Sequence, residues 1–348
     1  MNVPTDPAAF TTEWLAASLG APRGSLRDFA SKAVGTGQMS KSYRLALDWD
    51  DFQGPASVIA KCPSLDAKTR AIAQTMKCYT LELGWYRELA REAQVACPRC
   101  LHLESANDDL DFVLLLEDLA PAQAGDQLAG ASIKQIETAL KQAARLHAPF
   151  WGNGRADAYE WLRPNENATG MIRMLLPTLY PQFRERYAPR LSPDILEMGK
   201  AFVAKLDGYL TRAPTATTVQ HRDFRIDNIL FAPGDERAFI VDWQTLGMGA
   251  GASDVAYLIG TSIADPAVRA REERRFVEFY ARELAELGVA ADADALWREY
   301  RLYAFSGFLM AVLASMNVER TERGDEMFAV MAERPAWQIL ALDSLSLL

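Results

Sequence analysis

The sequence has few cysteines and histidines, no long apolar segment and no excess of positive charge. Its 348 residues include 4 cysteines and 3 histidines, too few for a disulfide framework and sparse for a zinc site. Cys97 and Cys100 form a single C-x-x-C pair. We interpret the pair as free thiols in a reducing cytoplasm, in preference to a metal or redox site.

Charge and hydropathy exclude further classes of partner. Lysine and arginine number 37 against 46 aspartates and glutamates, and the net charge of −9 disfavours nucleic acid and anionic membranes, which bind basic surfaces. The N-terminal residues show neither the basic nor the apolar region of a signal peptide. The most apolar stretch, residues 302–316, is too short to span a bilayer and predicts a buried core helix. We therefore expect a cytoplasmic protein, and nothing in the sequence implies a protein partner.

Length and composition predict a globular chain of about two domains. Hydrophobic residues make up 49% and charged residues 24% of the sequence, as is usual for folded proteins. Residues 1–117 mix strand and helix patterns, residues 118–131 form a connector rich in small residues, and residues 132–348 are mostly helical. The expected fold class is α+β.

Alternating apolar residues and turn signals divide the first half into strands and helices. Residues 43–49 alternate in the period of a half-buried strand. We expect a helix over 12–19, antiparallel strands over 26–34, 43–49, 56–61, 101–105 and 112–116, and one long helix, broken at most once, over 67–96.

Capping residues mark helix starts in the second half. Ser192-Pro193 and Asp265-Pro266 each join a capping side chain to a proline at the first helical position. Ser132 starts another helix that runs to His147. The only strand signals in this half lie at 228–231 and 239–241.

The strongest chemical signal is the segment HRDFRIDN at residues 221–228, followed by a strand and then by Asp242. Asp223 and Asn228 have the spacing of the kinase catalytic loop H-R-D-x-x-x-x-N. Asp242 stands where that pattern has the aspartate of D-F-G, although the triplet here is Asp-Trp-Gln. A carboxylate can accept the proton of an attacking hydroxyl, and carboxylate and amide oxygens suit Mg²⁺. The joint pattern predicts phosphoryl transfer from a nucleotide.

Lys61 ends an apolar strand, SVIAK at residues 57–61, in the layout of the kinase motif V-A-I-K. A cation at that position neutralises nucleotide phosphates, whereas the alternative is a surface lysine at a strand end. Glu82 on the following helix is the candidate for its ion-pair partner, with Glu88 and Glu92 as alternatives.

A glycine-containing segment, GTGQMS at residues 35–40, precedes the lysine strand. It has two glycines of the pattern G-x-G-x-x-G, and Ser40 replaces the third. The segment lies where a loop over phosphates would belong, although a plain hairpin is also possible. It opens no helix, which disfavours a Rossmann fold.

The chain resembles the aminoglycoside phosphotransferase and choline kinase superfamily, which has a protein-kinase-like fold. The resemblance rests on the segments above and on three more: ELGWY at 82–86, LLEDL at 115–119 and LHAPFW at 146–151. Within this superfamily, the chain looks most similar to ecdysteroid-kinase-like phosphotransferases. The resemblance covers roughly residues 30–260. It implies two lobes, a nucleotide-binding N-terminal lobe and a helical C-terminal lobe with the acceptor pocket, and it implies ATP and Mg²⁺ as cofactors.

By matching position, the resemblance implies that Asp223 is the catalytic base and that Asn228 and Asp242 are magnesium ligands. Lys61 contacts the phosphates, with Glu82 beside it.

The same resemblance implies a nucleotide-binding role for two further segments. Gly35, Gly37 and Ser40 belong to the loop over the phosphates. Glu117 to Leu119 form the hinge, whose backbone would hydrogen-bond adenine.

The chain departs from protein kinases after Asp242, where nothing resembles A-P-E or a long activation loop. A protein substrate is therefore disfavoured, and the expected acceptor is a small-molecule alcohol. We expect His221, Arg222 and Asp254 to be structural, and His147 to be a packing residue. A catalytically silent nucleotide-binding regulator, similar to a pseudokinase, is the alternative function.

The sequence does not name the acceptor, the oligomeric state or a preference for ATP over GTP. Aromatic and apolar residues of the helical half form either an acceptor pocket or ordinary helix packing: Phe150, Trp151, Tyr159, Trp161, Tyr300, Tyr303, Phe305, Phe308 and Met310. An apolar wall would suit a sterol-like alcohol, whereas choline would need an aromatic cage. The acidic stretch at 319–326 would suit an aminoglycoside, and a solvated helix end explains it equally well.

Overall fold

The computed structural model describes residues 3–35, 39–163, 166–317 and 320–348. The chain forms two compact units. Unit 1 comprises Met1–Glu92, Cys97–Pro121 and Asp242–Thr245, and unit 2 comprises Ala93–Ala96, Ala122–Val241 and Leu246–Leu348. Two short segments, 93–96 and 242–245, therefore belong to a different unit from the residues on either side of them.

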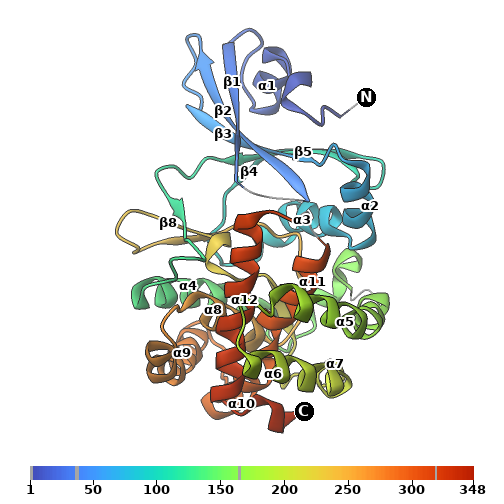
Figure 1. The fold of residues 1–348 in the computed structure, drawn as a ribbon. Helices are drawn as coiled ribbons and strands as arrows, with labels where there is room; N and C mark the ends of the chain where they lie inside the picture. The colour runs from blue at the N-terminus through green and yellow to red at the C-terminus, as the bar shows by residue number, and fades with distance from the viewer. Residues whose placement is uncertain (1–2, 36–38, 164–165, 318–319) are drawn as a thin grey trace. The chain divides into compact units, whose positions relative to one another are not determined.

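Unit 1 is built on an antiparallel sheet of five strands in the order β1-β2-β3-β5-β4 (Figure 1). Its strands are β1 (Leu26–Val34), β2 (Ser40–Trp49), β3 (Ser57–Pro63), β4 (Cys100–Ala106) and β5 (Asp111–Glu117). Its helices are α1 (Thr12–Ser18), α2 (Ala67–Thr75) and α3 (Cys78–Arg87), with short 3-10 turns at Pro7–Ala9 and Leu89–Arg91. The predicted strands are confirmed. The helix expected over 67–96 is broken at Met76 and Lys77, as the prediction allowed, but its predicted end was wrong, because α3 ends at Arg87 and the following 3-10 turn at Arg91.

One face of this sheet packs against α1. Leu45, Leu47, Val58 and Val113 point into a core that Leu15 of α1 closes. The alternation of apolar residues along β2 thus reflects a strand with one buried face, as the sequence predicts.

Unit 2 is mainly helical and carries three small strand pairings (Figure 1). Its helices are α4 (Ile133–His147), α5 (Glu166–Tyr187), α6 (Pro193–Ala204), α7 (Leu206–Leu210), α8 (Gly251–Ser262), α9 (Pro266–Glu286), α10 (Ala293–Tyr303), α11 (Phe305–Asn317) and α12 (Glu322–Ala341). Its strands are β6 (Gln123–Ala124), β7 (Thr218–Gln220), β8 (Ile229–Phe231), β9 (Ala238–Ile240) and β10 (Gly247–Gly249). The remaining 3-10 turns are Ala148–Phe150, Arg155–Ala158, Glu160–Leu162, Ile226–Asn228 and Ser344–Leu347.

Capping explains where several of these helices begin. Ser132 forms a reciprocal capping box with Gln135 at the start of α4. Ser192 and Asp265 cap α6 and α9 through their side chains, each followed by proline, so the predicted starts are confirmed. The apolar stretch 302–316 spans a break at Ala304, because α10 ends at Tyr303 and α11 begins at Phe305.

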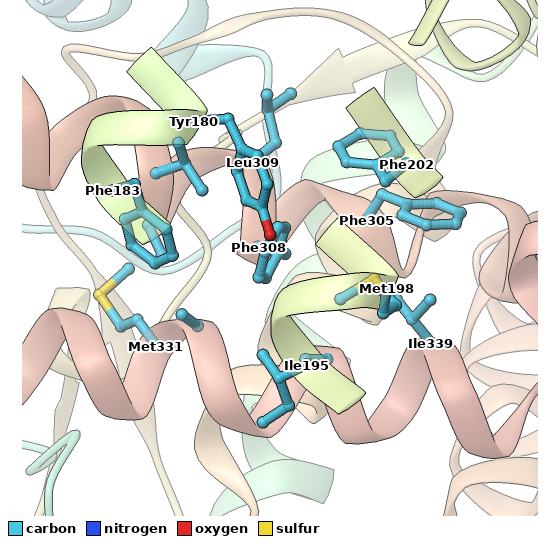
Figure 2. Close-up of a cluster of buried hydrophobic side chains, with 14 of the residues drawn as sticks. Tyr180, Phe183, Ile195, Met198, Phe202, Phe305, Phe308, Leu309, Met331 and Ile339 are labelled. Carbon is cyan, nitrogen blue, oxygen red and sulfur yellow. The ribbon is translucent and has the colours of Figure 1, made fainter. Parts of the chain in front are cut away.

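One hydrophobic core of unit 2 lies between α5, α6, α11 and α12 (Figure 2). Phe183 of α5 is fully buried there and packs edge-on against Phe308 of α11. Phe202 of α6 stacks on Phe305 with ring centroids 4.5 Å apart. None of the described helices combines the length and apolar character needed to cross a bilayer.

Helix α8 is the central element of unit 2. It packs against α4, α9, α10, α11 and α12, and its residues are almost all buried. A helix enclosed in this way can hold polar side chains in fixed positions, and α8 carries Asp254 and Tyr257.

The core predicts a clear difference between two apolar positions on α5. Replacing Phe183 by alanine should lower the free energy of unfolding by about 3–5 kcal/mol, because it leaves a large cavity. Replacing Met174, which is 67% exposed on the same helix, should change it by less than about 0.5 kcal/mol. Denaturant unfolding followed by circular dichroism measures both, and equal effects would contradict this packing.

Candidate active site

A buried ion-pair cluster forms around Lys61 at the end of β3. The Lys61 Nζ atom donates to Glu82 Oε1 over 2.6 Å and to Asp242 Oδ1 over 2.8 Å. The Lys61 side chain is 10% exposed and that of Glu82 2%. The structure thus brings three sequence-predicted site residues together within unit 1, and the glutamate that pairs with Lys61 is Glu82.

Burial and charge act in opposite directions on this cluster. Burial disfavours the Lys61 ammonium, but the nearby carboxylates of Asp242 and Glu82 outweigh it and raise the pKa of Lys61 above its usual range. Burial raises the pKa of Glu82, although the Lys61 charge opposes this. The lysine is therefore a permanent cation, suited to bind an anion.

A stacked tryptophan pair lies beside the cluster. Trp85 follows Glu82 by three residues on α3, and Trp243 follows Asp242 directly. Their ring centroids are 3.6 Å apart with an interplanar angle of 14°, and both side chains are fully buried. The stack ties the segment that carries Asp242 to the helix that carries Glu82. Asp242 itself has a left-handed backbone with φ of 68°, which costs about 1–2 kcal/mol outside glycine.

Gln244 also faces Asp242. Its Nε2 atom donates to Asp242 Oδ2 over 3.0 Å. Its Oε1 atom is buried and has no hydrogen-bond partner in the structure. A buried amide oxygen without a partner is costly unless it binds a ligand.

The glycine-containing segment joins β1 to β2. Gly35 directly follows β1 with φ of 74°, a conformation that glycine adopts without strain. Gly37 lies outside the described residues. Ser40 is buried at the start of β2.

The predicted hinge begins at the end of β5. The Glu117 backbone N–H donates to the Arg99 carbonyl oxygen over 2.9 Å, so this group is already satisfied. Asp118 accepts hydrogen bonds from Arg44 and Ser57, at 2.7 Å and 2.6 Å. These bonds hold Asp118 in place, directly before Leu119 in the chain.

Unit 2 holds the other half of the predicted site, in the loop after β7. The Asn228 Nδ2 atom donates to Asp223 Oδ2 over 2.8 Å and to the Asp223 carbonyl oxygen over 2.9 Å. Tyr257 of α8 donates from its hydroxyl to Asp223 Oδ1 over 2.8 Å. The Arg225 Nε atom lies 3.3 Å from Asp223 Oδ1. Asp223 and Asn228 are therefore adjacent.

Asp254 anchors the loop that carries Asp223. Its carboxylate accepts the backbone N–H of His221 over 2.7 Å and that of Arg222 over 2.9 Å, and it is 1% exposed. His147 lies behind it, with Nε2 at 3.2 Å from Asp254 and Nδ1 at 2.7 Å from the Tyr280 hydroxyl. His147 is fully buried, consistent with the packing role that the sequence predicts.

Arg222 has a left-handed backbone with φ of 65°, held by Asp254 on one side. Its guanidinium donates to the Met248 carbonyl oxygen over 2.8 Å. A Cβ atom on Gly247 would lie 2.2 Å from the guanidinium carbon, so only glycine permits this packing. Arg222 thus has a structural role.

The predicted site residues fall in two different units. Asp242 belongs to unit 1 and Asn228 to unit 2, so a metal shared by these two groups stays a prediction. Sequence reasoning missed Trp85, Gln244 and Tyr257. Gln244 alone carried a visible signal, because it completes the Asp-Trp-Gln triplet.

Four of the nine candidate acceptor residues lie in the core, and the other five are partly exposed. Phe150, Tyr300, Phe305 and Phe308 are buried at 1% exposure or less, as ordinary helix packing requires. In the acidic stretch, Asp325 accepts hydrogen bonds from Tyr187 and Arg320. The positions of these residues therefore do not indicate which acceptor the protein binds.

The C-x-x-C cysteines are free thiols. Burial raises the pKa of Cys97 to about 12, which keeps it protonated and unreactive. Among the residues with described positions, no group of three or more His, Cys, Asp or Glu side chains could hold a metal ion.

Sequence comparison decides the family. Residues 67–303, more than half of the chain, match the model of the phosphotransferase enzyme family. The chain belongs to this family. A search of curated proteins found no significant match, so closeness to the ecdysteroid-kinase-like branch stays a prediction.

Solved structures agree on the fold. A Ralstonia eutropha protein assigned provisionally as an aminoglycoside phosphotransferase is 14% identical, with a TM-score of 0.56 over 96% of each chain. The phosphotransferase APH(2″)-IIa, solved in a ternary complex with streptomycin and ATP, is 14% identical with a TM-score of 0.51, covering 97% of this chain and 99% of that one. A choline kinase from Cryptosporidium parvum is 10% identical with a TM-score of 0.51, covering 91% and 88%. The predicted superfamily and its mixed α+β fold are confirmed.

The Lys61 cluster predicts a pH-dependent loss of stability when the cation is removed. Lys61→Met should lower the free energy of unfolding by about 3–5 kcal/mol near pH 8, because it leaves two carboxylates uncompensated. Without the ammonium, burial and the charge of Asp242 both keep the folded-state pKa of Glu82 above its unfolded-state value. The folded variant then binds more protons than the unfolded chain, so its deficit should shrink as the pH falls toward the usual carboxyl range.

Denaturant unfolding at several pH values tests this, with Lys41→Met as control because Lys41 is exposed on the neighbouring strand β2. A deficit as small as that of the control, or one that does not depend on pH, would show that the cluster is not ionised as described.

Proposed function

We propose that this phosphotransferase moves the γ-phosphate of Mg·ATP to a hydroxyl group of a small molecule. The observation that carries the proposal is the held carboxylate of Asp223, which receives hydrogen bonds from Asn228 and Tyr257 and is still 17% exposed. A fixed and accessible carboxylate is the group that a general base requires.

In the proposed reaction, the acceptor oxygen attacks the γ-phosphorus and a new P–O bond forms. The bond from that phosphorus to the bridging oxygen of ADP breaks, and the acceptor proton passes to Asp223. The protein forms no covalent bond in such a transfer, so most of the catalysis comes from positioning the reactants and stabilising the charge on the phosphates. Lys61, held by Glu82, is the group we assign to the nucleotide phosphates.

We assign adenine to the hinge in unit 1. Within the described part of the chain, the backbone N–H and carbonyl of Leu119 make no hydrogen bond and are available to a base edge. The Glu117 N–H is occupied by Arg99, which leaves its carbonyl as the possible contact from that residue. Gly35, Gly37 and Ser40 remain our candidates for the loop over the phosphates.

The residues around Asp242 fit a magnesium ion. Asp242 offers a carboxylate, and Gln244 offers a buried amide oxygen that has no partner. Asn228 directs its amide nitrogen to Asp223, which leaves its own amide oxygen free to bind a hard cation. A magnesium ion held by Asp242 and Asn228, with Gln244 as an additional ligand, would neutralise charge on the transferred phosphate.

The neighbours' acceptors guide the choice of substrates. One neighbour binds streptomycin together with ATP, and another is a choline kinase. Structures of related phosphotransferases with GDP make the choice between ATP and GTP a matter for measurement. We therefore propose a panel of streptomycin, kanamycin, choline and ethanolamine, each with ATP and with GTP.

Asp223→Asn should lower turnover roughly 10²–10⁴-fold and leave nucleotide affinity nearly unchanged, because the base acts on the acceptor and does not bind the nucleotide. Transfer of labelled γ-phosphate measures turnover, and calorimetry measures ATP binding. Unchanged turnover in this variant would remove Asp223 from its role. Tight binding of ATP without turnover on any acceptor would favour the silent regulator.

Gln244→Leu should raise the Mg²⁺ concentration needed for half-maximal turnover about 3–10-fold, because one oxygen ligand is lost. Gln74→Leu, at an exposed position of α2, should leave it unchanged. A Mg²⁺ titration at saturating ATP provides the measurement. Equal magnesium requirements in both variants would show that Gln244 binds no metal.

A further inference from the structure

The proposed reaction assigns no step to the buried hydroxyl of Tyr257, which is bonded to Asp223. The residue lies on the central helix α8 and is 2% exposed, and its hydroxyl donates to Oδ1 of Asp223 over 2.8 Å. We propose that Tyr257 is a positioning residue for phosphoryl transfer, which fixes the orientation of the Asp223 carboxylate before the acceptor arrives. This inference rests on the proposed role of Asp223 as the base.

The carboxylate is held at both oxygen atoms by different elements of unit 2. Tyr257 of α8 binds Oδ1, and Asn228 of the loop binds Oδ2 over 2.8 Å. A single donor would allow the carboxylate plane to rotate about its Cβ–Cγ bond. The Arg225 Nε atom also lies near both oxygens, at 3.3 Å from Oδ1 and 3.4 Å from Oδ2. The bonds from Tyr257 and Asn228 are shorter, and with one on each oxygen they restrict that rotation. Each oxygen has two lone pairs, so a site for an acceptor hydroxyl is left.

Helix α8 supports the backbone and the side chain of Asp223 together. Asp254 accepts the backbone N–H groups of His221 and Arg222, and Tyr257 follows Asp254 by three residues on the same face of α8. Because α8 is enclosed by five other helices, neither contact can shift independently of the core. Helix α8 therefore fixes both the position of the loop backbone and the orientation of the Asp223 carboxylate.

The Tyr257 hydroxyl remains a donor at all relevant pH values. Burial, and then the negative charge of Asp223, raise the pKa of Tyr257 well above its ordinary value. The proton of this hydrogen bond thus belongs to the tyrosine. A hydrogen bond donated to the carboxylate weakens it slightly as a base, so the benefit of Tyr257 must come from orientation.

Tyr257→Phe removes one oxygen atom and keeps the ring in the core. We expect kcat to fall about tenfold, with the KM for ATP unchanged within twofold, because the nucleotide is bound by other residues. Turnover is measured as release of inorganic phosphate from Mg·ATP to water, and as transfer to whichever panel acceptor reacts fastest.

Tyr180→Phe is the matched control. Tyr180 is equally buried, at 4% exposure, and its hydroxyl donates to the Leu196 carbonyl oxygen in the hydrophobic core. The control should lose stability and keep its kcat. Equal losses of kcat in both variants would mean that Tyr257 acts only through stability, which would overturn the inference.

A double-mutant cycle with Asp223→Asn separates this inference from the proposed function. If Tyr257 acts through Asp223, Tyr257→Phe should have no further effect on kcat in the Asp223→Asn background. A full tenfold loss there would contradict positioning. If Asp223→Asn alone leaves kcat unchanged, the proposed base is wrong and the inference falls with it. If Asp223→Asn lowers kcat and Tyr257→Phe does not, only the inference fails.

Discussion

The loop that carries Asp223 depends on one buried carboxylate, that of Asp254. Two backbone N–H groups of the loop, from His221 and Arg222, would be left without partners in the core if this carboxylate were absent. Unsatisfied donors in a protein interior cost about 1–3 kcal/mol each, which is enough to displace a loop of this length. The hydrogen bond from Asp254 stabilises the left-handed backbone of Arg222, and this fixes the backbone position of the next residue, Asp223.

A second charged group organises unit 1 in a comparable way. Lys61 is buried, and it remains a cation because Glu82 and Asp242 surround it. The stacked rings of Trp85 and Trp243 keep the two carboxylates close to each other. The two carboxylates hold the Lys61 ammonium in one position through charge-assisted hydrogen bonds. Both units thus use buried ionic groups to hold polar side chains that a flexible surface could not fix.

Much of the fold was visible in the sequence because its elements are long or capped. Strand β2 alternates over ten residues, and Ser132, Ser192 and Asp265 are direct helix signals. Strands β6, β7 and β10 escaped prediction because two or three residues are too few to show a period, and they lack the apolar runs that mark the equally short β8 and β9. The position of the break between α2 and α3 was not predicted. Lys77 has a left-handed backbone there, and a lysine side chain gives no sequence signal for that conformation.

Some residues of the candidate site could likewise be predicted from the sequence, and others could not. The motif spacing predicted Asp223, Asn228 and Asp242 as site residues, because they match the order and spacing of the kinase pattern along the chain. Tyr257 and Trp85 act through contacts between distant segments, and a tyrosine or tryptophan on a buried helix looks like any other core residue in a sequence. Only the fold shows that the Tyr257 hydroxyl meets a carboxylate 34 residues earlier.

The most direct test of the central claim is to incubate the protein with ATP labelled at the γ-phosphate and a metabolite extract, and to identify every labelled product by mass spectrometry. We expect the label on a hydroxyl group of at least one small molecule, with equimolar ADP. Label found only in protein side chains, or ATP left intact while bound, would contradict it.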